Sequence, residues 1–178
     1  MLDFSETTLS QKMIHTGKII NVRVDQARQP DGKPCVREVV EHPGGVTILP
    51  ILDDGRLIFV EQWRYPLGRL LLEFPAGKLD PGERSNPLGA AQRELLEETG
   101  YTASSWELLS EIFTAPGFCD EKLWFYRATG LLKADYHQGD DDEFIELKIL
   151  SVEEALQKVK TREIVDAKTL SLLLFLNL

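Results

Sequence analysis

Three glutamates at helical spacing are the residues with the clearest chemical potential in this sequence. Glu94, Glu97 and Glu98 stand at positions i, i+3 and i+4, so a helix would place them on one face with Cβ atoms about 5–6 Å apart. A hard divalent cation such as Mg²⁺ or Mn²⁺ would relieve their mutual repulsion, because it prefers oxygen ligands. Arg93, four residues before Glu97, can pair with that carboxylate and orient it. A solvated acidic helix face is the alternative interpretation.

The segment that leads into these glutamates favours a metal site over a solvated face. Pro75-Ala76-Gly77 and the tight loop Asp80-Pro81-Gly82-Glu83 are suited to bring backbone carbonyls and one further carboxylate beside the glutamates. The sequence predicts a helix over Pro87–Thr99, with Asn86 as its N-cap and Gly100 immediately after its last residue.

Together these two segments resemble the Nudix box, which has a glycine, a glutamate after five residues, and then R-E-U-x-E-E-x-G-U, where U is bulky and apolar or aromatic. Gly77 and Glu83 have the family spacing, and Arg93 to Tyr101 match the helical half at every fixed position. Nine residues, 84–92, separate the loop glutamate from the arginine, where the family usually has seven. We interpret residues 84–86 as a lengthened loop. A strict-spacing alignment would put Ser85 in the glutamate's place, but the turn chemistry before Glu83 favours Glu83.

The resemblance implies a metal-dependent hydrolase that cleaves a nucleoside diphosphate linked to another moiety. In that family, metal ions held by the box neutralise the pyrophosphate charge and help to activate water. The implied cofactor is Mg²⁺, with Mn²⁺ as the alternative. Carried over by position, the metal ligands would be one backbone carbonyl and four carboxylates, from Ala76, Glu83, Glu94, Glu97 and Glu98. Glu97 would be a ligand or the partner of Arg93, so both residues are expected to take part in catalysis.

Similarity beyond the box points to the ADP-ribose pyrophosphatase branch of the family. Pro116 lies fifteen residues after Tyr101, where that branch carries a proline, in a loop that resembles its S-P-G-x-x-x-E pattern. The branch implies hydrolysis of a small-molecule substrate, ADP-ribose, to AMP and ribose 5-phosphate. The implied substrate-binding residues are Gln62, Arg64, Glu73, Pro116, Gly117, Phe118 and Glu121. Arg64 would reach a phosphate or ribose oxygen. For its neighbours Trp63 and Tyr65, packing in the core is favoured over stacking on a base.

Two other functions remain as alternatives. A nucleotide-sugar pyrophosphatase, acting for instance on GDP-mannose, shares most of these motifs. A catalytically silent nucleotide sensor, as in the Nudix domains of transcription regulators, usually loses box carboxylates and carries a DNA-binding domain. Here the carboxylates are intact and the net charge is −9, which also argues against nucleic-acid binding.

The catalytic base is expected outside the box, because a metal-bound carboxylate is a poor proton acceptor. The segment 139–143 offers four adjacent acids on a loop that can close over a substrate. Glu143 is the first candidate because it has the longest reach and borders the strand expected at 143–150. Asp142 is the second candidate, and a solvated acidic turn is the alternative interpretation.

The whole sequence indicates a mixed α/β, or α+β, fold. Its 178 residues are 43% apolar and 28% charged, as in ordinary globular proteins. Residues 18–28 and 35–41 predict a hairpin. Further strands are expected near 46–52, 56–62, 69–74, 106–113, 122–130 and 143–150, and further helices at 151–160 and 164–176. The resemblance implies a Nudix-type α/β/α sandwich over residues 43–178. It also implies a small N-terminal antiparallel sheet over residues 1–42 that pairs two copies as a homodimer.

The cysteines and the two ends of the sequence indicate a cytoplasmic protein with no membrane partner. Cys35 and Cys119 form no CxxC pattern, and two idle thiols are favoured over one long-range disulfide. The first residues have neither the basic nor the apolar region of a signal peptide. The apolar stretch 170–178 is too short to span a bilayer.

Overall fold

The computed structural model describes residues 3–134 and 144–177. The chain divides into two compact units, which are described separately below. The first contains the residues up to Gly44 together with Phe113–Lys122, and the second contains Gly45–Ile112 and the residues from Leu123 onward. The segment that carries Pro116 therefore groups with the N-terminal strands, although it lies far from them in the sequence.

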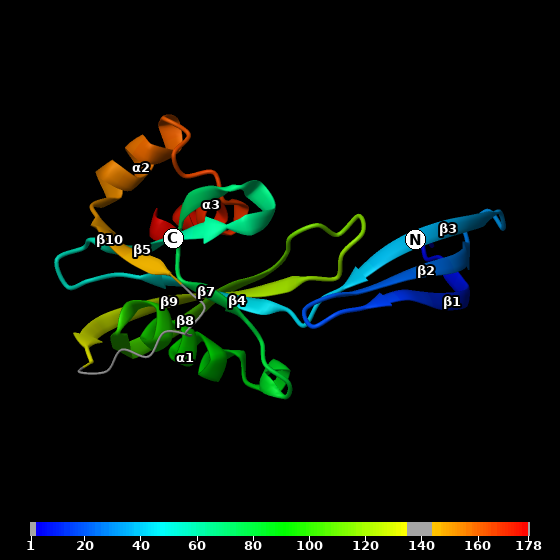
Figure 1. The fold of residues 1–178 in the computed structure, drawn as a ribbon, viewed down its shortest axis with the longest axis horizontal. Coiled ribbons are helices and arrows are strands. Elements are labelled where there is room, and N and C mark those ends of the chain that lie inside the picture. The colour runs from blue at the N-terminus through cyan, green and yellow to red at the C-terminus, as the bar shows by residue number, and fades with distance from the viewer. Residues whose placement is uncertain (1–2, 135–143, 178) are drawn as a thin grey trace. The chain divides into compact units, whose positions relative to one another are not determined.

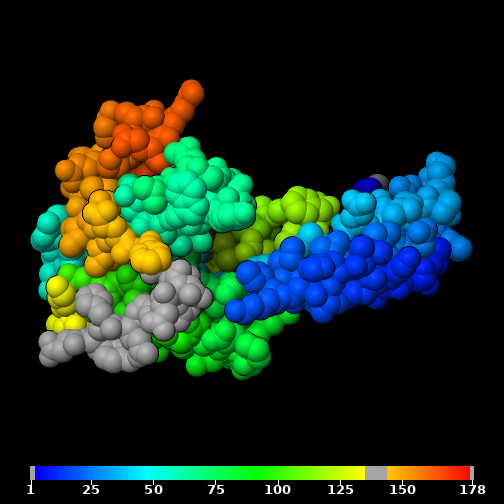
Figure 2. Space-filling model, viewed as in Figure 1, coloured from blue at the N-terminus to red at the C-terminus, as the bar shows by residue number. Residues whose placement is uncertain are grey.

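The first unit is built on an antiparallel sheet of three strands in the order β1-β2-β3. The predicted hairpin is present as β2 (Asn21–Arg28) and β3 (Pro34–Glu41), and Gly32 supplies the positive φ of their turn. The first strand, β1 (Thr7–Thr16), was not predicted. All ten of its residues are exposed, so its sequence lacks the alternation that marks a half-buried strand. The three strands form one continuous surface, blue to cyan in the space-filling view (Figure 2).

The second unit holds two sheets that place the predicted chemical residues. One sheet has the order β7-β4-β9-β8 and the other the order β10-β5-β6. In the first sheet β4 pairs parallel with β9 and antiparallel with β7, and in the second β5 pairs antiparallel with both neighbours. The strands are β4 (Gly45–Pro50), β5 (Leu57–Arg64), β6 (Arg69–Glu73), β7 (Ala76–Lys78), β8 (Tyr101–Phe113), β9 (Lys122–Lys133) and β10 (Ile145–Leu150).

Local capping chemistry determines where the first two helices begin and end. Helix α1 spans Pro87–Thr99 as predicted. The Asn86 side chain accepts a hydrogen bond from the Gly89 N–H, and Gly100 ends the helix with a φ of 71°. A Cβ on Gly89 would lie 2.5 Å from the Asn86 side-chain nitrogen, so this cap fits because residue 89 has none. Helix α2 (Val152–Lys160), expected at 151–160, begins with a capping box between Ser151 and Glu154.

The third helix begins later than the sequence pattern predicts. We expected it over 164–176, but α3 spans Ala167–Leu173 and continues as a 3₁₀ helix over Leu174–Asn177. Asp166 is its N-cap and accepts a hydrogen bond from the Thr169 N–H. Ile164 is fully buried although it lies outside the helix. Because Ile164 is apolar, it matched the helical pattern, and the predicted helix therefore began three residues before the observed one.

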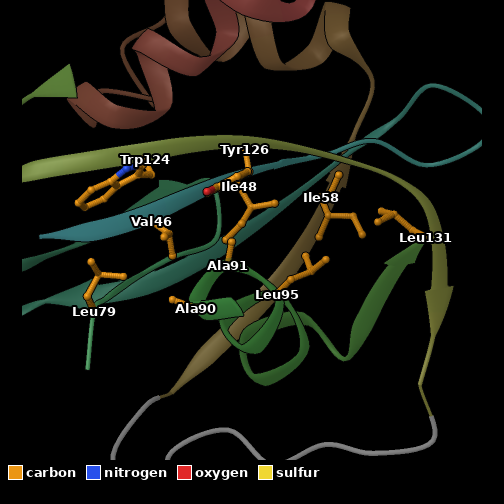
Figure 3. Close-up of a cluster of buried hydrophobic side chains, with 11 residues drawn as sticks. Val46, Ile48, Ile58, Leu79, Ala90, Ala91, Leu95, Trp124, Tyr126 and Leu131 are labelled. Carbon is orange, nitrogen blue, oxygen red and sulfur yellow. The ribbon is translucent and has the colours of Figure 1, made fainter. Parts of the chain in front are cut away.

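The helices cover the sheets of the second unit in layers, with α1 on one side and α2 and α3 on the other (Figure 1). Alternating strand residues supply two cores. Val46 and Ile48 of β4 point toward α1 and pack in one cluster with Ala91 and Leu95 (Figure 3). Leu49 belongs to the second cluster, which includes residues of α2 and α3. This arrangement confirms the predicted α/β/α fold class, and it holds α1 rigidly against β4 and β7.

Two further expectations concern the cysteines and membrane spans. Cys35 and Cys119 are both free thiols. Within residues 3–134 and 144–177, no helix is long and apolar enough to cross a membrane.

Candidate active site

One guanidinium gathers three of the predicted box carboxylates. Arg93 donates from Nε and Nη2 to the two carboxylate oxygens of Glu83, at 3.2 and 3.0 Å. Its Nη1 donates to Glu94 and to Glu97, both at 2.8 Å. The predicted pairing of Arg93 with Glu97 is therefore present, and it is one of three contacts made by the same side chain. Such charge-assisted hydrogen bonds restrict the orientation of each carboxylate.

Glu83, rather than Ser85, lies beside the arginine. A 3₁₀ helix over Glu83–Ser85 follows Gly82, whose φ is 95°. The Asp80 N–H donates to the Glu83 carboxylate at 2.8 Å, whereas the Ser85 hydroxyl donates to the Gly82 carbonyl. This turn accommodates the longer spacing between loop and helix while keeping the Glu83 side chain directed toward Arg93.

Hydrogen bonding to Arg93 shifts the pKa values in this cluster. The bonds from Arg93, and then the one from the Asp80 N–H, lower the pKa of Glu83 against the opposing effect of partial burial. Burial alone would lower the pKa of Arg93, but its hydrogen bonds with Glu83, Glu97 and Glu94 raise that pKa well above its ordinary value. Glu83 and Arg93 therefore both stay ionised at neutral pH.

Two of the box carboxylates, Glu94 and Glu98, lie against the short strand β7. The Glu98 carboxylate is only 9% exposed and accepts a hydrogen bond from the Ala76 N–H at 2.9 Å. The Glu94 carboxylate packs against Gly77, where a Cβ would lie 2.0 Å from the carboxylate carbon. Position 77 must therefore be glycine for Glu94 to keep this place. These contacts bring the carboxylates of α1 next to the backbone of Ala76.

The donor set has the chemistry of a site for a hard divalent cation. Its members are carboxylate oxygens and the Ala76 carbonyl, and the missing Cβ at Gly77 lets Glu94 approach the backbone. No group of three or more acidic, histidine or cysteine side chains is arranged as a ready metal site in the part of the chain that the structure describes. Arg93 and the Ala76 N–H hold the carboxylates instead. The residues fit the cation by donor type, and a bound cation would compete with Arg93 for Glu94.

A second charged cluster lies at the end of β6, where Glu73 is almost completely buried. Arg64 binds Glu73 in a bidentate pair, Nε to Oε1 at 2.7 Å and Nη2 to Oε2 at 2.6 Å. Lys168 of α3 also donates to Glu73 Oε2 and lies 3.0 Å from Asp166. Burial raises the pKa of Glu73, but the two cations outweigh burial and the net shift is downward. The charge of Glu98 contributes to the raised pKa of Arg64, after the hydrogen bonds to Glu73.

Strand β5 and the turn after it carry three further residues considered in the sequence analysis, Gln62, Trp63 and Tyr65. Gln62 is buried in the sheet, on the same face as Arg64. Packing in the core was favoured for Trp63 and Tyr65, and this interpretation was wrong, since they are 57% and 88% exposed. Trp63 is on the face opposite Arg64 because side chains alternate along a strand, and Tyr65 begins the turn that follows β5.

The predicted loop residues lie in the first unit. Pro116, Gly117 and Phe118 line an open pocket of about 480 Å³. Glu121 accepts a hydrogen bond from the Thr114 hydroxyl at 2.6 Å and has an oxygen 3.4 Å from Nδ1 of His42. Asp142 and Glu143, the predicted bases, lie outside the described residues.

Sequence reasoning assigned no role to Lys168 or to Thr169. The contact between Lys168 and Glu73 joins positions 95 residues apart. The Thr169 hydroxyl likewise accepts a hydrogen bond from the Phe74 N–H at 2.9 Å. No spacing rule reveals such long-range contacts.

Comparisons with known proteins identify the family and the fold of the chain. A family model described as "NUDIX domain" matches residues 41–173, and one described as "Nucleoside diphosphate sugar hydrolase N-terminal domain" matches residues 6–40. An ADP-ribose pyrophosphatase of Bacillus subtilis (strain 168) is 41% identical, over 100% of this chain and 96% of that protein. A GDP-mannose pyrophosphatase of Yersinia pestis (strain Pestoides F) is 33% identical, over 78% of this chain and 73% of that protein. A solved structure described as an ADP compounds hydrolase superposes with a TM-score of 0.84 at 25% identity, over 99% of this chain and 94% of that one.

Proposed function

The chain belongs to the Nudix family, and from that premise we propose that it hydrolyses the pyrophosphate bond of ADP-ribose, producing AMP and ribose 5-phosphate. The observation that carries the choice of substrate is the 41% identity, over the full chain, to a relative named ADP-ribose pyrophosphatase. The site supports the choice of chemistry, because four carboxylates and the Ala76 backbone meet beside α1.

A panel of compounds tests this proposal. The protein is incubated with Mg²⁺ and separately with ADP-ribose, GDP-mannose, NADH, ADP-glucose and dinucleoside polyphosphates, and the products are identified by mass. ADP-ribose should be hydrolysed most efficiently, and excess EDTA should abolish its turnover. The 33% identical relative named GDP-mannose pyrophosphatase supports a second candidate function. Strong turnover of GDP-mannose with none of ADP-ribose would select that function instead.

As a Nudix hydrolase the chain depends on a divalent cation, and we propose Mg²⁺ with Mn²⁺ as the alternative. When bound, the cation neutralises charge on the pyrophosphate and lowers the pKa of a bound water. The proposed ligands are the carbonyl of Ala76 and the carboxylates of Glu83, Glu94, Glu97 and Glu98. The Ala76 N–H holds the Glu98 carboxylate, and Arg93 orients the other three.

For substrate binding we propose contacts from both charged and loop residues. The Arg64 side chain is 35% exposed while its guanidinium is anchored on Glu73, which suits binding of a phosphate or ribose oxygen. Gln62 lies beside it on β5. The remaining proposed contacts come from the loop residues Pro116, Gly117, Phe118 and Glu121.

We propose Glu143 as the catalytic base, with Asp142 as the second candidate. The supporting argument is chemical, since carboxylates that bind a cation are poor proton acceptors. Glu143→Gln should lower kcat by about a hundredfold or more while KM and metal affinity change little, because only the transition state uses the base. Steady-state kinetics check this expectation. Near-normal kcat in both Glu143→Gln and Asp142→Asn would move the assignment to Glu97 or Glu83.

We also propose that residues 1–42 pair two copies of the chain in a C2 dimer. The N-terminal sheet supports this because it exposes several large apolar side chains, namely Leu9, Met13, Ile14 and Val36. Light scattering at micromolar concentration should give the mass of a dimer. A monomer mass would contradict the proposal, and so would full activity after deletion of residues 1–40.

A further inference from the structure

We propose that Lys168 is a positioning residue for substrate binding, because it shares the Glu73 carboxylate with Arg64 and so leaves the Arg64 guanidinium able to bind a substrate phosphate. The inference rests on the proposed function in two respects, the naming of ADP-ribose as the substrate and the assignment of Arg64 to substrate binding. It concerns a side chain on α3, far in sequence from the box and from every residue to which a role is assigned above.

The geometry places two cations on one buried carboxylate. Glu73 is 1% exposed, so protein groups rather than water must compensate its charge. Its Oε2 receives hydrogen bonds from both Arg64 Nη2 and Lys168 Nζ, and its Oε1 receives one from Arg64 Nε. The Lys168 side chain is 15% exposed and the Arg64 side chain 35%. Lys168 therefore occupies the closed side of the cluster and Arg64 the open side.

This sharing has an electrostatic consequence for Arg64. If Arg64 were the only cation on Glu73, a phosphate would have to compete with a buried carboxylate for the whole charge of the guanidinium. With Lys168 on the same oxygen, part of the carboxylate charge is already compensated. Arg64 then keeps its orientation through the bidentate pair while its attraction for an incoming anion is preserved.

Helix α3 is attached so that Lys168 stays in this place. Asp166 caps the helix by accepting hydrogen bonds from the Thr169 N–H and hydroxyl, at 2.9 and 2.7 Å, and it also lies 3.0 Å from Lys168. Thr169, which is fully buried, accepts a hydrogen bond from the Phe74 N–H. Two consecutive residues of α3 thus bind two consecutive residues at the end of β6. The Asp166 side chain and the contact of Thr169 with the Phe74 N–H therefore keep Lys168 next to Glu73.

The test compares substrate affinity with turnover. Lys168→Met removes the charge and Lys168→Arg restores it. Lys158→Met is the matched control, because it removes an ion pair between Lys158 of α2 and Glu163. We expect Lys168→Met to raise KM for ADP-ribose about fivefold to tenfold with kcat within about twofold. The other two variants should stay near the unsubstituted protein. In Lys168→Met, the affinity for inorganic pyrophosphate in the presence of Mg²⁺ should fall by the same factor. Calorimetry measures this affinity and requires no hydrolysis.

A double-variant cycle decides whether Lys168 acts through Arg64. In an Arg64→Lys background, Lys168→Met should add less than about a twofold change in KM or in pyrophosphate affinity. An unchanged KM in Lys168→Met, or the same factor in both backgrounds, would overturn the proposal. If thermal unfolding shows that Lys168→Met is not folded, Lys168→Gln keeps a donor for Glu73 and is judged by the same criteria. Failure of the proposed function is recognised separately, since the unsubstituted chain would then bind pyrophosphate without hydrolysing ADP-ribose.

Discussion

The two charged clusters of the second unit are built from the same kinds of side chain in different proportions. In the box cluster, one guanidinium serves the carboxylates of Glu83, Glu94 and Glu97, and Glu98 lies on a backbone N–H. In the other cluster, Glu73 and Asp166 are matched by two cations, Arg64 and Lys168. The first composition suits an added cation, whereas the second is balanced within the protein.

The difference also appears in how each cluster is held. In the box cluster, the side chains of Glu83 and Glu97 are partly exposed and share Arg93. Glu73 is sealed from water and contacted from two elements, β5 and α3. In a cluster that must accept a ligand, the charged groups remain accessible to solvent. In a cluster that orients one side chain, the charged groups are buried and paired within the protein. The substitutions below are chosen to contradict or refine this contrast.

The largest effect is expected from Glu98→Gln. This change keeps an acceptor for the Ala76 N–H and removes one ligand charge, so the fold should survive while kcat falls about a hundredfold or more at saturating metal. Steady-state kinetics together with thermal unfolding check this. Glu107→Gln is the control, because it removes an exposed carboxylate that pairs with Arg127 on the same unit. Equal kcat in the two variants would mean that the box is a solvated acidic face.

A smaller loss of activity is expected from Gly77→Ala. The new Cβ would lie 2.0 Å from the Glu94 carboxylate carbon, so Glu94 must leave its place beside β7. We expect kcat to fall about tenfold or more, since a displaced ligand still keeps its charge. The added methyl should raise the metal concentration needed for half-maximal activity, which a metal titration measures. Unchanged metal dependence would show that the contact between Gly77 and Glu94 has no functional importance.

The contribution of the Glu73 cluster to the free energy of unfolding should depend on pH in the acid range. The folded pKa of Glu73 is below its ordinary value of 4.5. Its contribution to the free energy of unfolding is therefore present above about that pH and is lost as the pH falls through the folded pKa. Glu73→Gln should lower stability by about 1–3 kcal/mol at neutral pH and reduce the further loss between neutral pH and pH 3. Urea unfolding across this range measures both effects.

Glu83→Gln gives the comparison from the box cluster. The pKa of Glu83 is also lowered, but its side chain is 25% exposed, so water screens part of its interaction with Arg93. The stability change should have the same sign and be smaller. An equal or larger change would contradict the contrast between an open and a closed cluster.

The sequence predicted the elements whose ends are determined by neighbouring residues. Helix α1 was correct at both ends because Asn86 and Gly100 act within one turn of it. Strand β1 was missed because its exposed residues follow no alternation, and its pairing with β2 sets its register. Helix α3 was extended too far because the burial of Ile164 is a tertiary property that an apolar residue alone cannot report.

The candidate site divides in the same way. Residues that share one helix or one turn, such as Arg93 and Glu97, were identified from their spacing. The bidentate contact with Glu83 depends on the 3₁₀ turn before α1, and the contact of Lys168 with Glu73 depends on how α3 meets β6. Those contacts arise from the packing of separate elements, which the spacing of residues along the chain does not describe.

The cap of α1 restricts which residue types fit at the start of this helix. Glycine is among the poorest helix formers, yet residue 89 must lack a Cβ because the Asn86 side chain occupies that space. Replacing Gly89 alone would displace the cap, and replacing Asn86 alone would leave a helix with both a weak cap and a glycine. Changing both positions together would remove the close contact and the poor helix former at once. At the start of the helix that carries the box carboxylates, the residue types at positions 86 and 89 therefore depend on each other.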